Sequence, residues 1–373
     1  MAKESGSGYV KDHEHHLDHQ IKEVEEEIRK TPYNKATQAH IGRLKAKLAK
    51  LRGEAEKGSG KGQAPGFAVK KSGDATVLLV GFPSVGKSTL INKLTNAESK
   101  TADYDFTTTG VIPGMLEHNG AKIQMLDIPG MIVGASAGKG RGRQVLSVVR
   151  NADLILIIID DAKQLEPVKK ELYAAGMRLD EKRPDVKITK KETGGMSINI
   201  AVKKPLLDVA TVRSILSEFK IHNADVLIRE NATAEQLIDA TMKNRVYVPS
   251  LVVCNKIDKM DYAGFNRFSK EMKNVIFISA MTGKNLEILR DAIWRRLEMV
   301  RIYMKPVGKE ADMSEPLIMK RGVTITDAAE KILRGNAKNL RYGRIWGPSA
   351  KFGGQRVGKL HQLKDKDTVE LHI

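Results

Sequence analysis

The chain contains one segment that can hold the phosphates of a nucleotide. Residues 81–88 read Gly-Phe-Pro-Ser-Val-Gly-Lys-Ser and match the pattern GxxxxGK[ST]. A strand-like run, 76–80, precedes this segment and a helical pattern follows from Ser88, so its backbone N–H groups are expected to face an anion. Lys87 would reach the β- and γ-phosphates, and Ser88 would ligate Mg²⁺. The expected nucleotide contacts here are Gly81, Phe82, Pro83, Ser84, Val85, Gly86, Lys87, Ser88 and Thr89.

A carboxylate follows the next expected strand. Asp127-Ile-Pro-Gly130 has the form DxxG and comes directly after residues 122–126, which read as a buried strand. DxxG alone is usually just a turn, but its place after a phosphate loop makes it a strong signal. Asp127 would reach Mg²⁺ through a water molecule, and the Gly130 N–H would sense the γ-phosphate.

The tetrapeptide Asn255-Lys256-Ile257-Asp258 indicates which base is bound. Asp258 can accept two hydrogen bonds from guanine, one from the ring N–H and one from the exocyclic amine. Adenine lacks this donor pair and would leave the carboxylate unpaired. Asn255 and Lys256 would brace the loop and flank the base, and Ser279-Ala280 would offer a backbone N–H to the guanine carbonyl. In this order, each at a strand end, the motifs predict GTP and GDP as ligands.

A threonine-rich loop lies between the phosphate loop and DxxG. Residues 103–109 read Asp-Tyr-Asp-Phe-Thr-Thr-Thr, and a threonine there would ligate Mg²⁺ and close over the γ-phosphate as a switch. The spacing from Ser88 favours Thr108, with Thr107 or a plain polar loop as alternatives. Lys87, Thr108 and Gly130 thus form the expected catalytic set, and Ser88, Thr108 and Asp127 the expected metal ligands.

The glutamine that many GTPases carry directly after DxxG is absent, because Met131 stands there. A thioether accepts hydrogen bonds too weakly to position water. The sequence therefore predicts slow intrinsic hydrolysis, with the missing group supplied by another residue, a monovalent cation or a ribosomal partner. The glycine-rich segment 134–142 that follows carries Lys139 and Arg141, and it is either a solvated loop or a second switch.

The elements that must position these residues alternate between strand and helix. The expected buried strands are residues 76–80, 122–126, 154–159, 250–254 and 275–278. Helical stretches between them predict an α/β domain with a parallel-rich sheet. Residues 12–56 carry two helical apolar repeats that break at 31–34, which predicts a helical hairpin. The more polar segment 180–246 reads as an inserted small α/β module.

The charge of the chain suggests a polyanionic partner such as RNA. Lys and Arg number 63 against 45 Asp and Glu, for a net charge of +18. Residues 331–364 hold nine Lys or Arg and no Asp or Glu, interleaved with Tyr342, Trp346 and Phe352. Cations there would neutralise phosphates and aromatic rings would stack on bases, unless Tyr342 and Trp346 are core residues of a small fold.

Composition excludes several classes of protein. The single cysteine, Cys254, rules out an internal disulfide and a cysteine-rich zinc site, and it fits a reducing cytosol. The most apolar run, 154–159, is far shorter than the about 20 residues that cross a bilayer. The first residues lack the apolar region of a signal peptide. We therefore expect a cytoplasmic protein without membrane contact.

With these motifs in place, the chain resembles the developmentally regulated GTP-binding proteins, a branch of the Obg-like translation-factor GTPases. The resemblance covers nearly the whole chain, and its matching segments are 81–88, 104–108, 127–130, 138–143, 219–225, 255–258 and the C-terminal segment. It implies a helical hairpin with a linker (1–70) and a P-loop GTPase domain in two parts (71–179 and 247–300). It also implies an inserted small α/β domain (180–246) and a C-terminal ubiquitin-like, β-grasp TGS domain (301–373).

The resemblance also implies partners and a cation. Family members look like ribosome-associated GTPases that act with a stabilising partner protein and favour K⁺, and TGS domains are tied to RNA or ribosome contact. Potassium-dependent relatives often have Asn or Asp where this chain has Ser84, which offers only a neutral oxygen, so the K⁺ expectation stays open. We expect a monomeric GTPase that acts as a ribosome- or RNA-associated switch, with no DNA partner. The alternative is a GTP-stabilised scaffold that brings a partner protein to RNA without needing turnover.

Overall fold

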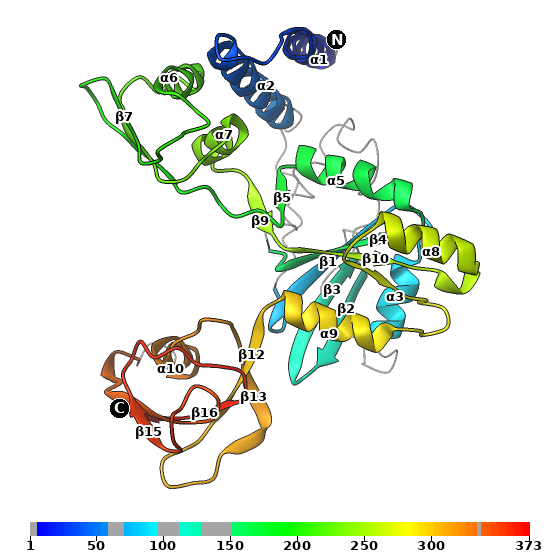
Figure 1. The fold of residues 1–373 in the computed structure, drawn as a ribbon, viewed down its shortest axis with the longest axis vertical. Helices are drawn as coiled ribbons and strands as arrows, with labels where there is room; N and C mark the ends of the chain where they lie inside the picture. Colours follow the sequence, from blue (N-terminus) through cyan, green and yellow to red (C-terminus); the bar gives the residue numbers. More distant parts are fainter. Residues whose placement is uncertain (1–5, 59–70, 96–111, 128–150, 334–336) are drawn as a thin grey trace, which may run out of the picture. The chain divides into compact units, whose positions relative to one another are not determined.

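The computed structural model describes residues 6–58, 71–95, 112–127, 151–333 and 337–373. Of these residues, 6–58 and 172–247 form one compact unit, and the others form a second unit. Figure 1 shows the helices and strands of both. Among the helices in the described ranges, none combines the length and the apolar composition needed to cross a membrane.

The second unit contains a six-stranded sheet (Figure 1). Its order is β11-β10-β4-β1-β3-β2. The strands are β1 (Ala75–Val80), β2 (Ile112–His118), β3 (Ala121–Asp127), β4 (Leu154–Ile159), β10 (Ser250–Cys254) and β11 (Val275–Phe277). All neighbours are parallel except β2, which pairs antiparallel with β3. The five expected strands and the parallel-rich sheet are confirmed, whereas β2 was not anticipated.

Helices cover this sheet, because its central strands carry apolar side chains on both faces. Every residue of β1 and of β4 is buried. The helices are α3 (Lys87–Leu94), α5 (Leu165–Ala174), α8 (Tyr262–Glu271) and α9 (Leu286–Arg296). Leu90 of α3 and Leu289 of α9 share one core cluster with Val77 and Leu79 of β1. The sheet is therefore held rigidly beneath the loops that leave its strand ends.

The C-terminal part of the second unit is a five-stranded sheet with one helix. Its order is β13-β12-β16-β14-β15, and β12 and β16 pair parallel while the other pairs are antiparallel. The elements are β12 (Met299–Met304), β13 (Asp312–Lys320), α10 (Ile325–Leu333), β14 (Tyr342–Trp346), β15 (Gln355–Val357) and β16 (Asp367–His372). Ile302, Ile345 and Val369 line its own core beneath α10. A β-grasp domain of the expected kind is confirmed.

The first unit begins with the expected helical hairpin. Helix α1 spans Gly6–Lys30 and α2 spans Gln38–Gly58. Leu17 and Val24 of α1 pack against Leu44 and Leu51 of α2 in a small apolar cluster. This packing follows from the apolar spacing of three and four residues that places such side chains on one helix face.

A small α/β module completes the first unit. The three-stranded sheet β6-β8-β7 is formed by β6 (Val186–Lys190), β8 (Ala224–Ile228) and β7 (Met196–Ile200). Helices α6 (Val209–Glu218) and α7 (Ala234–Met242) cover its apolar face, and β5 (Met177–Leu179) pairs with β9 (Val246–Val248). Helix α2 packs on this module, since a Cβ on Gly42 would lie 3.0 Å from the Thr211 side chain. The sequence had not indicated that hairpin and module form one unit.

A buried ion pair fastens α7 to β5. The Arg178 Nε and the Asp239 Oδ2 atom are 2.6 Å apart, and their side chains are only 4% and 3% exposed. The Nη2 atom of Arg178 donates to Asp239 Oδ1 at 2.9 Å, and the Nε atom of Arg245 donates to the same oxygen at 3.1 Å. Every carboxylate oxygen therefore has a partner, which is the condition under which a buried charge is tolerated.

Replacing Asp239 with alanine tests this pair. Asp239→Ala leaves the Arg178 guanidinium buried without its carboxylate, so the first unit should lose about 3–5 kcal/mol of stability. Both tryptophans, Trp294 and Trp346, lie in the second unit, so the loss should be measured as faster hydrogen exchange in β8 and α7. Exchange in β1 should not change. The triple variant Arg178→Met/Asp239→Leu/Arg245→Met removes all three charges and should recover most of the protection. Equal loss in the two variants would contradict this role.

Candidate functional site

The phosphate loop leaves β1 and enters α3, as the sequence predicts. It runs from Gly81 to Gly86, whose φ of 93° places it in the left-handed region directly before the helix. A Cβ on Gly81 would lie 2.2 Å from the Ile158 carbonyl oxygen, and one on Gly86 would lie 2.5 Å from the Asn255 amide nitrogen. Both glycines are thus required by close approach, and the loop leads directly into the N-terminus of α3, where N–H groups favour an anion.

The lysine of the loop is held over it. Lys87 Nζ donates to the carbonyl oxygens of Gly81 and Phe82, each at 3.1 Å. These neutral acceptors leave its positive charge uncompensated by any carboxylate among the described residues. An ammonium in this position is available to a nucleotide phosphate.

A pair of oxygen donors lies beside the loop. The Ser88 hydroxyl donates to Asp127 Oδ2 at 3.2 Å. Asp127 is only 4% exposed, and its other oxygen, Oδ1, is buried and has no hydrogen-bond partner among the described residues. An unpaired buried carboxylate oxygen is costly, so this atom fits a cation or a cation-bound water. The donor set of hydroxyl and carboxylate is the kind that Mg²⁺ prefers.

Asn255 connects the phosphate loop with the loop after β11. Its side-chain nitrogen donates to the Val85 carbonyl at 2.8 Å, and its Oδ1 accepts from the Ala280 N–H at 2.9 Å. Asn255 is only 2% exposed. The Ala280 N–H therefore already donates to Asn255. Its contact with the guanine carbonyl stays a prediction, and it requires that Asn255 and guanine share this N–H.

Asp258 projects toward solvent from the short helix η3 (Ile257–Lys259). A hydrogen bond from the Ser279 side chain holds the pKa of Asp258 below its ordinary value. The carboxylate is therefore ionised at neutral pH and can accept from two donors, as guanine recognition requires.

Sequence reasoning missed a carboxylate that fixes Lys256. Lys256 has a φ of 64°, which is unfavourable for a residue with a side chain, and its Nζ lies 2.6 Å from Asp160 Oδ2. Gln164 donates to the other Asp160 oxygen at 2.6 Å. Burial opposes ionisation of Asp160, but the bonds from Lys256 and Gln164 outweigh it, so its pKa lies below the ordinary value. The available signal was the position of Asp160 directly after a parallel strand.

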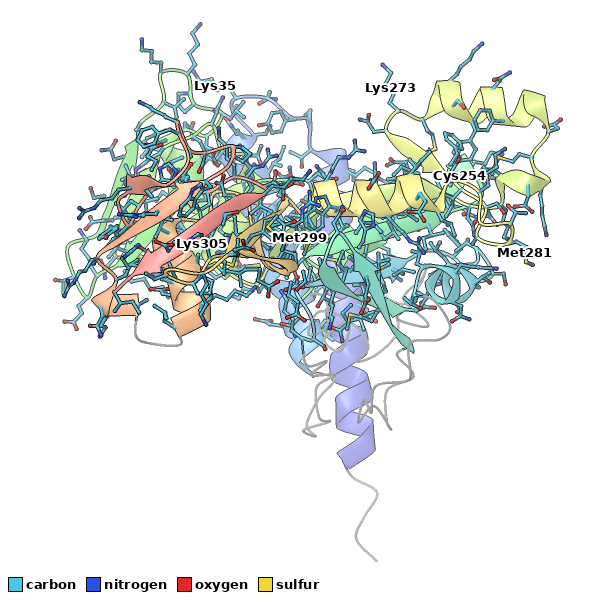
Figure 2. All side chains as sticks on the ribbon, turned by 90° about the horizontal axis from the view of Figure 1, so that it is seen from below. Lys35, Cys254, Lys273, Met281, Met299 and Lys305 are labelled. Carbon is cyan, nitrogen blue, oxygen red and sulfur yellow. The ribbon has the colours of Figure 1, made fainter. Side chains whose placement is uncertain are left out.

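The neighbouring thiol takes no part in this network. Cys254 ends β10 and is fully buried (Figure 2). Burial raises the pKa of Cys254 to about 12, so the thiol stays protonated and unreactive. The buried thiol therefore serves packing at the end of β10, directly before Asn255.

Several predicted site residues lie outside the described residues. These are Thr108 with its alternative Thr107, Gly130, Met131 and the segment 134–143. The predicted site residues that the structure does describe lie at the loops that leave the sheet. They include Lys87, Ser88, Asp127, Asn255, Lys256, Asp258, Ser279 and Ala280. Their arrangement offers a cation, an orphaned carboxylate oxygen and a base-binding loop in one place.

Comparison with known proteins identifies the family. A model described as a 50S ribosome-binding GTPase matches residues 76–191, the C-terminal region of the same domain matches 193–299, and a TGS domain matches 300–373. Developmentally-regulated G-protein 3 of Arabidopsis thaliana is 45% identical over 359 residues, which cover 94% of this chain and 97% of the relative. The chain belongs to the developmentally regulated GTP-binding proteins.

Other relatives agree over the same length. Developmentally-regulated GTP-binding protein 1 homolog of Dictyostelium discoideum is 44% identical over 362 residues, covering 94% of this chain and 98% of the relative. A GTP-binding protein of Methanocaldococcus jannaschii is 53% identical over 363 residues, covering 96% of this chain and 93% of the relative. As a member of the family, the chain is a GTP-binding protein of the GTPase class with a TGS domain.

Asp160 should act as a positioning residue for the guanine loop. In Asp160→Asn one amide oxygen remains to accept, while the amide N–H₂ meets a second donor, so Lys256 or Gln164 loses its bond. We expect GDP affinity to fall by about tenfold, measured with a fluorescent GDP analogue. Asp161→Asn removes the same charge one residue away, where Asp161 only caps η2 (Ala162–Gln164), and should change affinity little. Equal losses of GDP affinity in the two variants would contradict the assignment. Faster hydrogen exchange in β4 of the nucleotide-free Asp160→Asn protein would also contradict it, because the strand itself would then be destabilised.

Proposed function

We propose that the chain is a Mg²⁺-dependent GTPase whose nucleotide state controls its binding to the ribosome. The observation that carries the proposal is the convergence of Lys87, the unpaired Asp127 oxygen and the Asn255-braced guanine loop. Together these groups offer a cation to phosphates, an oxygen to a metal ion and a loop to guanine, which are the three parts of a Mg²⁺-bound guanine nucleotide.

The roles of the side chains follow from their chemistry. Lys87 neutralises charge on the β- and γ-phosphates, and Ser88 and Asp127 hold the metal ion directly and through water. Bound Mg²⁺ supplies charge that stabilises the transferred phosphoryl group. Thr108 and Gly130 are proposed to close on the γ-phosphate, so that loss of this phosphate releases them. Asp258, Lys256 and the Ala280 N–H select guanine.

Slow turnover is part of the proposal, because Met131 stands where a water-orienting glutamine is common. K⁺ beside the phosphate loop is one source of the missing group, although Ser84 offers a weaker ligand than Asn or Asp. Ribosomal contact is another source. Turnover would then time the stay of the protein on its partner.

Met131→Gln tests the missing group. If a water-orienting side chain limits the rate, this variant should hydrolyse GTP about tenfold faster than the parent, measured as phosphate release under single-turnover conditions. Each protein should be assayed in KCl and in NaCl at equal ionic strength, because a K⁺ effect would appear in the parent and shrink in the variant. A parent that is already fast, with no change in the variant, would refute slow intrinsic turnover.

The RNA-facing surface is proposed to lie on the C-terminal sheet. Gly343 and Ile345 face the core of this domain, so Tyr342, Arg344 and Trp346 alternate onto the outer face. Neither Tyr342 nor Trp346 belongs to the core cluster of this domain, which supports a place for both on its outer face rather than in its core. Cations on an open sheet face provide the charge that RNA backbones bind.

Aromatic and charged groups are layered on this face. The Tyr342 ring stacks on His372 with centroids 4.4 Å apart, and the Arg356 guanidinium carbon lies 3.9 Å from the Tyr342 centroid. Lys305 Nζ lies 5.1 Å from the Trp346 centroid. Arg341 and Arg344 are exposed beside these layers. Arg344 and Arg341 therefore remain accessible to phosphates, while Tyr342 is already engaged by protein groups.

The family name of the GTPase model supports ribosome contact, as do the TGS domain and the net charge of +18. We further propose a monomer in the cytoplasm that acts with a stabilising partner protein. The alternative is a scaffold that GTP merely stabilises. The intact Lys87, Ser88 and Asp127 favour the switch, since a scaffold needs no metal chemistry.

Co-sedimentation with ribosomes from the same source separates these functions. The protein should pellet with ribosomes more strongly with a non-hydrolysable GTP analogue than with GDP or without nucleotide. Such a difference would support a nucleotide-timed switch. Equal binding in all three states would reject the switch and leave the scaffold.

Variants on the outer sheet face extend this experiment. Arg341→Gln/Arg344→Gln should weaken ribosome binding and lower the slope of log affinity against log salt by about 0.7–0.9 for each phosphate that is no longer neutralised. Lys270→Gln/Lys273→Gln removes the same charge from exposed positions at and after α8 and should leave the slope unchanged. An unchanged slope in the arginine variant would remove the C-terminal face from the proposal.

A further inference from the structure

The tip of the first unit brings together two loops that are distant in sequence. The turn between α1 and α2 lies beside the loop that leads into α6, because the Gln38 side-chain nitrogen donates to the Leu206 carbonyl oxygen. Hydrogen bonds from Thr211 hold the pKa of Asp208 below its ordinary value, and the charge of Lys35 lowers it further. Lys35 therefore lies near the start of α6.

Three large apolar side chains are exposed at this tip. Tyr33 is 70% exposed, Leu206 is 52% exposed and Val209 is 45% exposed. Single exposed apolar residues are common, but here they occur on two adjoining loops. Lys35, Lys203 and Lys204 are exposed on the same two loops, and none of the three makes an ion pair within the described parts of the chain.

Both loops are held in place by hydrogen bonds. In the turn, the Ala36 N–H donates to Asn34 Oδ1 at 2.9 Å and the Thr37 hydroxyl donates to the Pro32 carbonyl at 2.6 Å. In the other loop, the Leu206 N–H donates to Asn231 Oδ1 at 2.7 Å. The backbone around Tyr33 is thus held by its neighbours, and little backbone entropy is lost when the ring makes a contact.

We propose that this tip surface, defined as Tyr33, Lys35, Lys203, Lys204, Leu206 and Val209, binds single-stranded RNA. The proposal rests on the proposed RNA-associated function and adds a second contact on the other compact unit. A base stacks on the Tyr33 ring, and Lys203 and Lys204 neutralise phosphates, together with Lys35, whose charge is shared with the nearby Asp208. Leu206 and Val209 cover the apolar edge of the stacked nucleotide.

The balance of charge favours RNA over a protein partner. An acidic protein segment would also meet the lysines, but the chain as a whole carries a charge of +18, which attracts polyanions at long range. Tyr342, in contrast, is layered between His372 and Arg356. Tyr33 has no ring or cation contact among the described residues and is 70% exposed, so its ring is accessible to a base.

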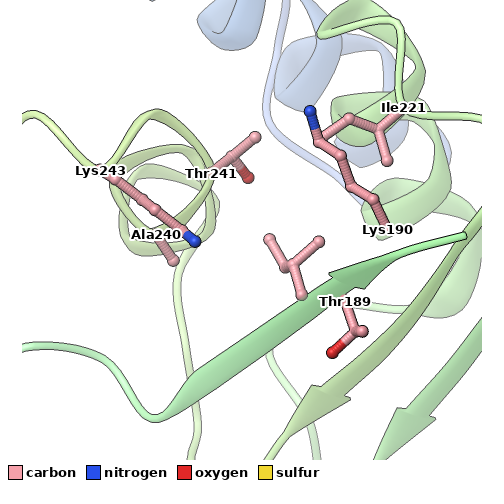
Figure 3. A pocket seen from close by; sticks show the side chains of 7 residues that line it. Thr189, Lys190, Ile221, Ala240, Thr241 and Lys243 are labelled. Atoms are coloured by element: carbon pink, nitrogen blue, oxygen red, sulfur yellow. The ribbon is translucent and has the colours of Figure 1, made fainter.

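A second basic position in the same unit provides a control. A hollow of about 360 Å³ lies between β6 and the end of α7, with Lys190 and Lys243 on its lining (Figure 3). Both lysines are exposed, and the hollow has no aromatic side chain on its lining. Lys190→Gln/Lys243→Gln therefore removes positive charge from the unit without touching a stacking ring.

The test uses the full chain and a ten-nucleotide uridine oligomer that carries one 4-thiouridine and a fluorescent label. Ultraviolet irradiation followed by mass spectrometry should place a cross-link on the peptide that contains Tyr33. In an anisotropy titration, Tyr33→Ala should weaken binding by about tenfold, and Tyr33→Phe should restore it. Lys35→Gln/Lys203→Gln/Lys204→Gln should lower the salt slope by about 0.7 for each phosphate that is no longer neutralised. Lys190→Gln/Lys243→Gln should leave the Tyr33 cross-link intact.

Two results would overturn the proposal. One is unchanged oligomer binding in Tyr33→Ala together with no cross-link in residues 31–37. The other is unchanged oligomer binding but weaker sedimentation with ribosomes, which would make the tip a contact for ribosomal protein. The cross-linking and anisotropy experiments with the RNA oligomer do not depend on whether GTP or GDP is bound. Failure of the nucleotide-timed switch would therefore be seen only in the sedimentation experiment with ribosomes.

Discussion

The side chain of Asn255 fixes the distance between the phosphate and base ends of the site. Its amide donates to the Val85 carbonyl and accepts from the Ala280 N–H, while its backbone N–H donates to Ile159. Only a side chain with a donor and an acceptor in one fork can make both side-chain contacts. Three loops from three strand ends meet at this buried residue. A shift in the phosphate loop would therefore move the guanine loop as well.

This junction explains why the glycines of the phosphate loop serve protein packing as well as phosphate binding. A side chain at Gly86 would strike the Asn255 amide, and one at Gly81 would strike the Ile158 carbonyl on the adjacent strand β4. The loop can therefore stay close to β4 and β10 only without these side chains. The glycines of the pattern GxxxxGK[ST] thus meet two requirements, phosphate binding and close packing, and this makes the pattern specific.

The sequence predicted the residues that act at strand ends, because their signals are local. Strands β1, β3, β4, β10 and β11 are apolar runs, and each motif follows one directly. Asp160 was missed because its partner Lys256 lies 96 residues away, and no local pattern announces such a bond. Strand β2 was missed because Pro113 and Gly114 lie within it, yet Gly114 lets β2 approach α3 closely. The packing of the hairpin on the small α/β module depends in a similar way on Gly42. Its contact with α6 involves residues far away in the sequence, so no local pattern predicts it.

Net charge is a weak guide to partners until the pairing of each charge is known. Lys45 and Lys191, both in the first unit, are neutralised by Glu235 and Asp225, so they contribute to structure rather than to an external field. Lys35, Lys203 and Lys204 belong to the same unit and have no such partner in the described residues. The same distinction applies to aromatic rings, since Tyr342 is already stacked and Tyr33 is open. The unpaired cation beside an open ring, rather than the total of +18, is therefore the feature that points to a polyanion at a particular place.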